Sequence, residues 1–349
     1  MKLEIYFTKI PLLNPYYLAF QKVEFLDAVY CMVEKNGEQH WGETTPLPGY
    51  SWETVESIKR DLNEVLQNSR NESDLKQAIQ TKKVSSPFAM SCINIALEKH
   101  KLQNDPKSVR VPLVGIISSS DEREIEQQLG EQLELGFSII KVKAQGTLSK
   151  DVEKVEFIQR ILPPCVKIRI DANQGFALDD APHFLSILDP DKVELFEQPY
   201  SPENWKEMAE LNASSSIPLM LDESIWTKEH IDRTVNEGCA SLVKLKLQKH
   251  ASIKETKELI AYARANGLGV VFGNGVQSEL GCFDEALIAD ECNLTRPLEL
   301  NGFLKHKPFD TGLIRFQDGF ATTSIEKVFS KEDIEPYMLT QIETSLDNS

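Results

Sequence analysis

Charged residues end a series of apolar, β-branched segments in the middle of the chain. Asp171 ends one such segment, Glu197 ends the next, and Asp222 ends the third. Lys246 occupies the segment after that, so the successive intervals are 26, 25 and 24 residues. Each interval has the length of one strand and one helix. The spacing therefore predicts that the four side chains lie at matching heights on neighbouring parallel strands.

Three carboxylates gathered at one place repel one another unless a cation holds them. All-oxygen ligands favour a hard divalent cation, and we expect Mg²⁺. Lys141 and Lys143 are two residues apart, so both point to the same side of their strand. A lysine near other positive charges has a lowered pKa, and its neutral form is a competent general base. Lys246 would approach the metal-bound substrate from the side opposite to Lys141 and Lys143. Lys244 is expected to have a structural role. Any one of these charged residues, taken alone, is more simply explained as a member of a salt bridge or as a solvated group at a strand end.

The elements that must position these residues alternate regularly between strand-like and helix-like patterns. We expect strands at 111–117, 138–144, 166–172, 193–198, 218–223, 241–247, 269–275 and, more weakly, 297–302. Amphipathic helical stretches separate them, which predicts an α/β fold built as a (β/α)8-type, modified TIM barrel. An open doubly wound sheet is the rival, but Gly273-Asn274-Gly275 lacks the third glycine of a phosphate-binding fingerprint.

The two ends of the chain have a different pattern. Residues 1–110 begin with alternating strands and continue with two helical stretches, which predicts an α+β capping domain. Residues 303–349 return to short strand-like pieces and are expected to pack back on this cap. The catalytic barrel would then occupy residues 111–302.

Composition excludes several classes of protein. The 349 residues include 38 Lys+Arg against 54 Asp+Glu, a formal net charge of −16. Such an acidic surface argues against nucleic-acid and anionic-membrane partners. No apolar run approaches the ~18 residues of a membrane span. Six scattered cysteines without a close pair favour reduced thiols and a cytoplasmic protein. We expect a small carboxylate as the substrate. For the assembly state, a homo-oligomer is the alternative to a monomer.

Several segments together resemble the enolase superfamily, specifically its muconate lactonizing enzyme subgroup, which includes o-succinylbenzoate synthases and dipeptide epimerases. The matching segments are IKVK (140–143), IDANQG (170–175), FEQP (196–199), LDES (221–224), KLQK (246–249) and WGETTPLPGYSWET (41–54). The resemblance implies a cap over a barrel and abstraction of a proton α to a substrate carboxylate. It also implies a metal-stabilised enediolate, the scheme already described for this superfamily.

The resemblance assigns roles to individual residues. It implies that Mg²⁺ is held by three carboxylates, those of Asp171, Glu197 and Asp222. Lys143 would be the base on one face of the substrate and Lys246 the base or acid on the other. Lys141 would support the substrate carboxylate and the enolate charge, while Asn173 and Glu223 would orient the ligands and lysines.

Other positions depart from the relatives and bear on the substrate. Gln277 stands where many relatives have Glu, and Ala251-Ser252 replaces a glycine pair. Dipeptide epimerases carry Asp-x-Asp where this chain has Glu299-Leu300-Asn301. We expect Gln277, Glu299 and Asn301 to contact substrate. Aromatic residues of two cap loops are further candidates, with packing of the cap core as the alternative: Tyr16, Tyr17, Phe20, Tyr50 and Trp52.

The altered segment at 299–301 favours an o-succinylbenzoate synthase-like dehydration, a lyase reaction with Lys143 as base and Lys246 mainly as a cation. The alternative is an isomerase, a racemase or epimerase of N-acylamino acids or dipeptides that uses both lysines as bases. A muconate-type cycloisomerase is a third reaction, and a non-catalytic barrel scaffold is the alternative of another class. His250 is expected at the surface, at the start of a helix.

Overall fold

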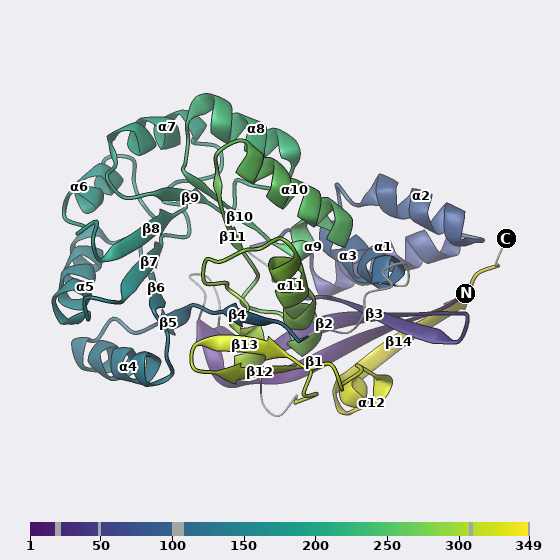
Figure 1. Cartoon of the computed structure of the whole chain (residues 1–349). Helices are drawn as coiled ribbons and strands as arrows, with labels where there is room; N and C mark the ends of the chain where they lie inside the picture. The colour runs from purple at the N-terminus through teal and green to yellow at the C-terminus, as the bar shows by residue number, and fades with distance from the viewer. Residues whose placement is uncertain (18–21, 48–49, 100–107, 307–309, 348–349) are drawn as a thin grey trace.

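The structure is a computed structural model that describes all residues except 18–21, 48–49, 100–107, 307–309 and 348–349, and the side chains of 15–17 and 22. It has a parallel sheet with helices on its outside and an antiparallel sheet at one side (Figure 1). The predicted α/β class, with a barrel and an α+β cap, is confirmed. No helix in the described ranges is long and apolar enough to cross a membrane.

The cap is built on a four-stranded antiparallel sheet in the order β14-β1-β2-β3. Its strands are β14 (Met338–Ser345), β1 (Lys2–Tyr17), β2 (Lys22–Lys35) and β3 (Glu38–Thr44). Successive side chains of a strand point to opposite faces. Leu3 and Ile5 therefore pack in one buried cluster, and Tyr6 and Ile10 pack in another on the other face. Both faces of this sheet are covered.

Three helices cover one face of the cap sheet: α1 (Val55–Gln67), α2 (Glu72–Lys82) and α3 (Pro87–Lys99). Thr54 caps α1, accepting a hydrogen bond from the backbone N–H of Ser57. Glu53 caps α3 with its two carboxylate oxygens, which accept from the N–H groups of Phe88 and Ala89 at 2.8 and 2.9 Å. Both capping residues follow Tyr50 closely in the chain.

The barrel has seven parallel strands in the order β11-β10-β9-β8-β7-β6-β5. They are β5 (Gly115–Ile117), β6 (Ile139–Lys143), β7 (Lys167–Asp171), β8 (Val193–Glu197), β9 (Leu219–Leu221), β10 (Leu242–Leu245) and β11 (Gly269–Phe272). Lys143 pairs with Asp171, and Asp171 pairs with Glu197. This register places Lys143, Asp171 and Glu197 side by side, whereas Glu197 pairs with Met220, so Asp222 lies two residues further along than the predicted matching height.

Helices follow the strands and line the outside of the sheet (Figure 1). They are α4 (Glu122–Glu134), α5 (Leu148–Ile161), α6 (Asp180–Ser186), α7 (Trp205–Ser214), α8 (Lys228–Glu237), α9 (Leu247–His250), α10 (Ile253–Ala265) and α11 (Glu279–Glu291). A continuous apolar core joins them to the strands.

The eighth strand expected at 297–302 is reduced to an isolated bridge between Leu113 and Leu298. Backbone hydrogen bonds still run to both neighbours, from Val114 N–H to Leu298 O and from Glu299 N–H to Phe272 O, each 3.1 Å. The segment then turns into the 3₁₀ helix η1 (Asn301–Leu304). It therefore closes the barrel without forming a regular strand.

The expected strand at 111–117 is divided in two. β4 (Arg110–Pro112) pairs with β13 (Phe320–Thr323), which pairs in turn with β12 (Ile314–Gln317). The last segments are α12 (Lys331–Ile334), η2 (Glu335–Tyr337) and β14. The tail thus adds a hairpin beside the barrel and one strand to the cap sheet.

Candidate active site

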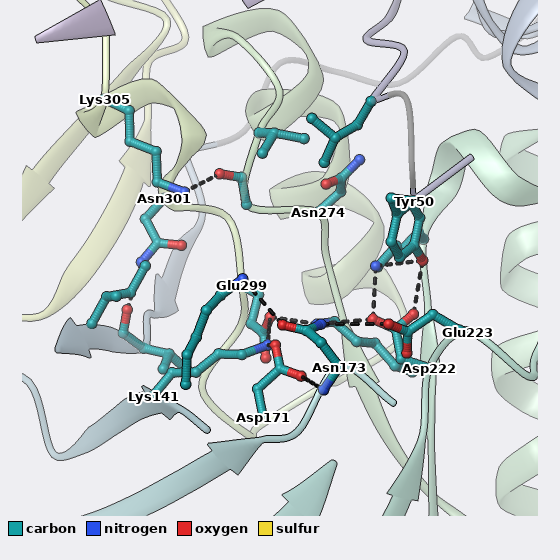
Figure 2. Close-up of a pocket in the computed structure, with 18 of the residues that line it drawn as sticks. Tyr50, Lys141, Asp171, Asn173, Asp222, Glu223, Asn274, Glu299, Asn301 and Lys305 are labelled. Carbon is teal, nitrogen blue, oxygen red and sulfur yellow. Dashed lines mark hydrogen bonds and ion pairs between the residues drawn. The ribbon is translucent and has the colours of Figure 1, made fainter. Parts of the chain in front are cut away.

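A cavity of about 250 Å³ lies at the carboxyl ends of the barrel strands, beneath the cap (Figure 2). In parallel barrels this face carries the chemistry. Leu47, Tyr50 and Phe88 reach it from the cap. Charged side chains from β6, β7, β10 and the loop after β9 line much of the rest of it. The cavity is therefore built jointly by the two parts of the fold.

Three buried carboxylates, those of Asp171, Glu197 and Asp222, are bridged by two buried lysines. Lys141 Nζ lies 2.9 Å from Asp171 Oδ2 and 2.8 Å from Glu197 Oε2. Lys244 Nζ lies 3.0 Å from Glu197 Oε1 and 3.4 Å from Asp222 Oδ2. The three carboxylates predicted at the strand ends thus form one connected cluster with Lys141 and with Lys244, which was expected to have only a structural role.

The pKa shifts differ between the carboxylates of this cluster. Burial and the neighbouring Asp171 raise the pKa of Glu197 to about 7, against the lowering effect of the two lysines. Burial alone would raise the pKa of Asp222, but the lysines around it, Lys246 first, hold it well below its usual range. The lysines therefore stabilise the charged form of Asp222 more than that of Glu197.

These carboxylates fit a hard divalent cation by their chemistry. All of their donor atoms are oxygen, as Mg²⁺ requires. Glu223, beside Asp222, also has a buried Oε2 that meets no hydrogen-bond partner in the part of the chain that the structure describes. Within the described residues no three His, Cys, Asp or Glu side chains already form a metal-binding group. Lys141 and Lys244 lie among the carboxylates instead, so a metal ion would compete with their ammonium groups for the same oxygens.

Two lysines stand on either side of the carboxylate strands. In the sheet, β6 with Lys143 and β10, which leads into Lys246, flank the three strands β7, β8 and β9. Lys143 Nζ donates to Asn173 Oδ1 at 3.2 Å, and Asn173 makes a weak contact of 3.4 Å to Glu223. Burial, and then the neighbouring Lys244, lower the pKa of Lys246. A lowered pKa favours the neutral form that a general base needs.

Tyr50 joins the cap to the site. Its hydroxyl donates to Asp222 Oδ1 at 2.8 Å and accepts from Lys246 Nζ at 2.5 Å. The Lys246 ammonium also lies 3.8 Å from the centre of the Tyr50 ring. Of the cap aromatics expected near substrate, Tyr50 thus lines the cavity and contacts a proposed base.

Other expected substrate contacts lie elsewhere. Trp52 is 57% exposed and packs on Trp226 with ring centres 4.6 Å apart, so it does not line the cavity. Gln277 is fully buried against Gly281, and its amide atoms have no hydrogen-bond partner among the described residues. It does not line the cavity either. Phe20 and the side chains of Tyr16 and Tyr17 lie outside the described residues.

Glu299 and Asn301 do line the cavity, but both are engaged by the protein. Glu299 accepts from Lys141 at 2.9 Å, from Arg169 at 2.8 Å and from Lys244. Asn301 Nδ2 donates to the carbonyl of Val114 at 2.6 Å. Glu299 is therefore a buried counter-ion rather than an open carboxylate.

Two further lysines near the site were not predicted. Lys249 donates to Asp222 O at 2.7 Å and Asp222 Oδ1 at 3.2 Å, and burial lowers its pKa to about 8. The KLQK spacing was its only signal, because a short helix after β10 puts residues three apart on one side. Lys305 and Asn274 also line the cavity, and nothing in their local pattern indicated it.

His250 corrects the sequence prediction of a surface position, because it is 5% exposed. It ends α9, which packs against α3 of the cap. Glu285 of α11 was also unexpected. Its carboxylate accepts from the N–H groups of Leu247 and Asn274 at 3.2 and 3.1 Å, and burial raises its pKa to about 8. It ties together the ends of β10 and β11.

Comparisons with known proteins agree with this arrangement. Residues 124–323 match the family described as Enolase C-terminal domain-like, and residues 1–97 match the one described as MenC, N-terminal domain. An L-Ala-D/L-Glu epimerase of Francisella tularensis subsp. novicida is 25% identical over 300 residues, which cover 80% of this chain and 84% of that protein. An N-succinyl-L-Arg/Lys racemase of Bacillus cereus is 22% identical over 341 residues, covering 90% and 92%.

Solved structures share the fold at low identity. The crystal structure of N-succinyl Arg/Lys racemase from Bacillus cereus has a TM-score of 0.88 at 20% identity, covering 99% of both chains. A dipeptide epimerase from Cytophaga hutchinsonii, complexed with Mg and the dipeptide D-Ala-L-Val, has a TM-score of 0.86 at 21% identity. It covers 98% of this chain and 99% of that one.

Proposed function

The chain belongs to the enolase C-terminal domain-like family of enzymes, and from this premise we propose that it is a racemase or epimerase acting on N-acylated amino acids. Its reaction would move the proton at the carbon next to a carboxylate. The names of the curated relatives, epimerases and racemases, favour this reaction over the o-succinylbenzoate synthase-like dehydration that the sequence favoured. The observation that carries the proposal is the pair Lys143 and Lys246 on opposite sides of the carboxylate strands.

The two lysines would act in turn as base and acid. A neutral Lys246 Nζ removes the α-proton from one face, and the Lys143 ammonium delivers a proton from its Nζ to the other face. The opposite enantiomer reacts in the reverse sense, which makes the reaction a 1,1-proton transfer. Lys141, whose ammonium is held by carboxylates, would supply positive charge next to the reacting carboxylate.

Asp171, Glu197 and Asp222 would hold a Mg²⁺ ion in this site. When bound, the ion would bind the substrate carboxylate and stabilise the negative charge that develops there. Asn173 would orient Lys143 through the contact at 3.2 Å. Tyr50 would close the cap side and orient Lys246. These roles follow from the contacts of each side chain and remain part of the proposal.

Dehydration remains the second candidate, because of one observation at the eighth strand position. Glu299 is engaged by Lys141, Lys244 and Arg169 and so offers no open carboxylate for a substrate ammonium group. A dipeptide with a free amino group is therefore disfavoured. An o-succinylbenzoate synthase-like elimination needs no ammonium site, and it would use Lys143 as base and Lys246 as a cation.

Solvent-deuterium exchange tests the proposal. The wild-type protein, with Mg²⁺, is incubated in D₂O with N-succinyl-L-phenylalanine or its D-enantiomer, and loss of the α-proton is followed by NMR. We expect Lys246→Ala to reduce exchange of one enantiomer by at least ~100-fold and Lys143→Ala to reduce exchange of the other, because each lysine serves one face. Lys206→Gln, a change at an exposed lysine of α7, is the control.

Two results would contradict the racemase. One is that each lysine variant loses exchange of both enantiomers equally. The other is that the wild type exchanges neither substrate but releases water from a hydroxy-acid substrate, which would establish the dehydration instead.

A further inference from the structure

A carboxylate outside the cavity holds the backbone next to the proposed base Lys246. Glu285 belongs to α11, is fully buried and does not line the cavity. One of its oxygens accepts a hydrogen bond from the N–H of Leu247 at 3.2 Å, and the other accepts from the N–H of Asn274 at 3.1 Å. Leu247 directly follows Lys246 in the chain, and Asn274 lines the cavity (Figure 2). The carboxylate therefore acts on the frame of the site rather than on the space for a substrate.

This contact begins where the pairing of β10 with β11 ends. Leu245 and Phe272 are the last paired residues, and one more backbone hydrogen bond joins the N–H of Gly273 to the carbonyl of Leu245 at 3.1 Å. The next N–H groups of both segments are buried, and a buried donor without an acceptor costs free energy. The carboxylate of Glu285 has two oxygens and accepts from one N–H group of each segment. It thus continues the connection between the two strand ends.

Lys246 is held on both sides along the chain as a result. Its backbone is extended, with φ −137° and ψ 128°, and it lies between Leu245, which is paired in the sheet, and Leu247, which the carboxylate holds. Both leucines are buried in the barrel core. Successive side chains of an extended segment point to opposite sides, so Lys246 points to the cavity. Its Nζ is held separately, by Tyr50 and Asp222.

The other proposed base lies far from this contact in the sheet. Lys143 ends β6, and the strands β7, β8 and β9 separate β6 from β10. The Nζ of Lys143 donates to Asn173 Oδ1 at 3.2 Å. A change at Glu285 should therefore displace one lysine much more than the other. A displacement of about 1 Å at a reacting group can lower the rate about 100-fold.

We propose that Glu285 is a positioning residue for Lys246 and that it supports proton transfer on one face of the substrate only. It acts through the backbone N–H of Leu247, whose position sets where the Lys246 side chain begins. The contact to Asn274 holds the neighbouring strand end at the same time. This role rests on the proposed racemase function and adds a residue to it that lies on a helix outside the barrel sheet.

Glu285→Gln tests this role, because an amide keeps the size of the carboxylate but offers one acceptor oxygen in place of two. Exchange of the α-proton is followed with Mg²⁺ for N-succinyl-L-phenylalanine and its D-enantiomer. Lys246→Ala identifies the enantiomer that depends on Lys246. For that enantiomer we expect kcat to fall at least ~10-fold in Glu285→Gln, while KM changes less than about threefold. For the enantiomer that depends on Lys143, kcat should fall less than about threefold.

Asp284→Asn is the matched control for loss of a buried carboxylate on α11. Asp284 is the neighbouring residue and is also buried, but its carboxylate pairs with Lys99 of the cap at 2.5 Å. This variant should lower the free energy of unfolding without changing the ratio of the two kcat values. Thermal unfolding checks that each variant is folded. If Glu285→Gln does not fold, Glu285→Asp, which withdraws the carboxylate by one methylene group, should show the same one-sided loss.

The positioning role is overturned if Glu285→Gln lowers kcat equally for both enantiomers, or for neither. Crystal structures of the wild type and of Glu285→Gln test it without turnover. The Nζ of Lys246 should move by about 1 Å or more between them, whereas the Nζ of Lys143 should keep its position. A wild type that exchanges neither enantiomer refutes the racemase, and the two crystal structures then decide the positioning role alone. An unmoved Lys246 overturns it.

Discussion

Buried ion pairs at the scale of single residues hold the candidate site together. Arg169 is fully buried and donates to Glu299 at 2.8 Å and to Glu194 at 2.9 Å. Glu299 also accepts from Lys141 and Lys244. Removing charges from water is costly, and the attraction between them offsets this cost only when every group keeps its partners. The cluster is therefore sensitive to the loss of any one member.

Arg169→Met tests this sensitivity. We expect the free energy of unfolding in urea to fall by about 3–5 kcal/mol, because the buried Glu299 and the half-buried Glu194 lose a shared cation. Arg296 also pairs with Glu194, at 2.9 Å, but its side chain is 45% exposed. Arg296→Met should therefore cost less than about 1 kcal/mol. Equal losses in the two variants would show that burial of the Arg169 pair does not matter.

Binding of Mg²⁺ by the carboxylates is a second prediction at this scale. A ligand that binds only the folded state stabilises it, and at 100 times its Kd the gain is about 2.7 kcal/mol. We expect Mg²⁺ at that excess to raise the Tm of the wild type by about 4 °C. The shift should vanish in Asp171→Asn and persist in Asp191→Asn, a change at an exposed loop position. An unchanged shift in Asp171→Asn would remove this carboxylate from the proposed metal site.

At the scale of elements, short segments between the barrel and the cap decide which side chains are buried. α9 continues β10 for one turn and ends at Ala251, whose φ is +54°. The carbonyl of Ala251 accepts from Asn94 Nδ2 of α3 at 2.7 Å. This hydrogen bond holds α9 against α3 of the cap, so His250 is buried. The local sequence pattern alone predicts a surface position for His250.

His250 makes stability depend on pH. Burial, and then the charge of Lys249, lower its pKa to about 3 from an ordinary value of about 6.5. Below pH 6.5 the unfolded chain therefore binds a proton that the folded chain does not, so stability is lost as the pH falls from 6.5 toward 3. At pH 5 this loss is about 2 kcal/mol.

His250→Leu removes the titrating group. Between pH 7.5 and pH 5, the free energy of unfolding of the variant should improve relative to the wild type by about 2 kcal/mol, measured by urea unfolding at each pH. His183→Gln, at an exposed ring, is the matched control. Parallel pH profiles for wild type and His250→Leu would contradict the prediction.

At the scale of the whole molecule, the cap and the barrel share hydrogen bonds as well as the cavity. Glu43, at the end of β3, is buried, and its carboxylate accepts from the N–H groups of Ser278 and Gly281 at 2.7 and 2.8 Å. These donors lie at the N-terminal end of α11, where a carboxylate satisfies groups that the helix leaves unpaired. The proposed proton transfer depends on this contact between cap and barrel, because Tyr50 of the cap hydrogen-bonds to Lys246 of the barrel.

Glu43→Ala tests the contact between the cap and the barrel. It leaves two buried N–H groups without their acceptor, and we expect the free energy of unfolding to fall by about 2–4 kcal/mol. Tryptophans stand in both parts, Trp41 in the cap and Trp205 in the barrel, so fluorescence and circular dichroism together report whether the parts unfold in one transition. Glu38→Ala, on the same strand but exposed, is the control. A loss no larger than that of Glu38→Ala would refute the coupling.

The sequence by itself determined the α/β class and the strand ends that carry charge. The reason is local, because one strand and one helix occupy about 25 residues, and charges repeating at that interval reach one height on a parallel sheet. Asp171, Glu197 and Lys143 follow this rule. The same rule does not predict the irregular closing segment at 297–302, where a single bridge replaces a strand.

Only the tertiary structure decided which charges meet. Glu299 looked like a substrate contact, yet it pairs with Lys141 and Arg169, which are 158 and 130 residues away in the chain. Closure of the barrel brings these residues together, and no local pattern contains that information. The same closure brings Lys305 into the cavity. Spacing along the chain thus sets the height of a charge, whereas its partner, its burial and its pKa depend on contacts between distant segments.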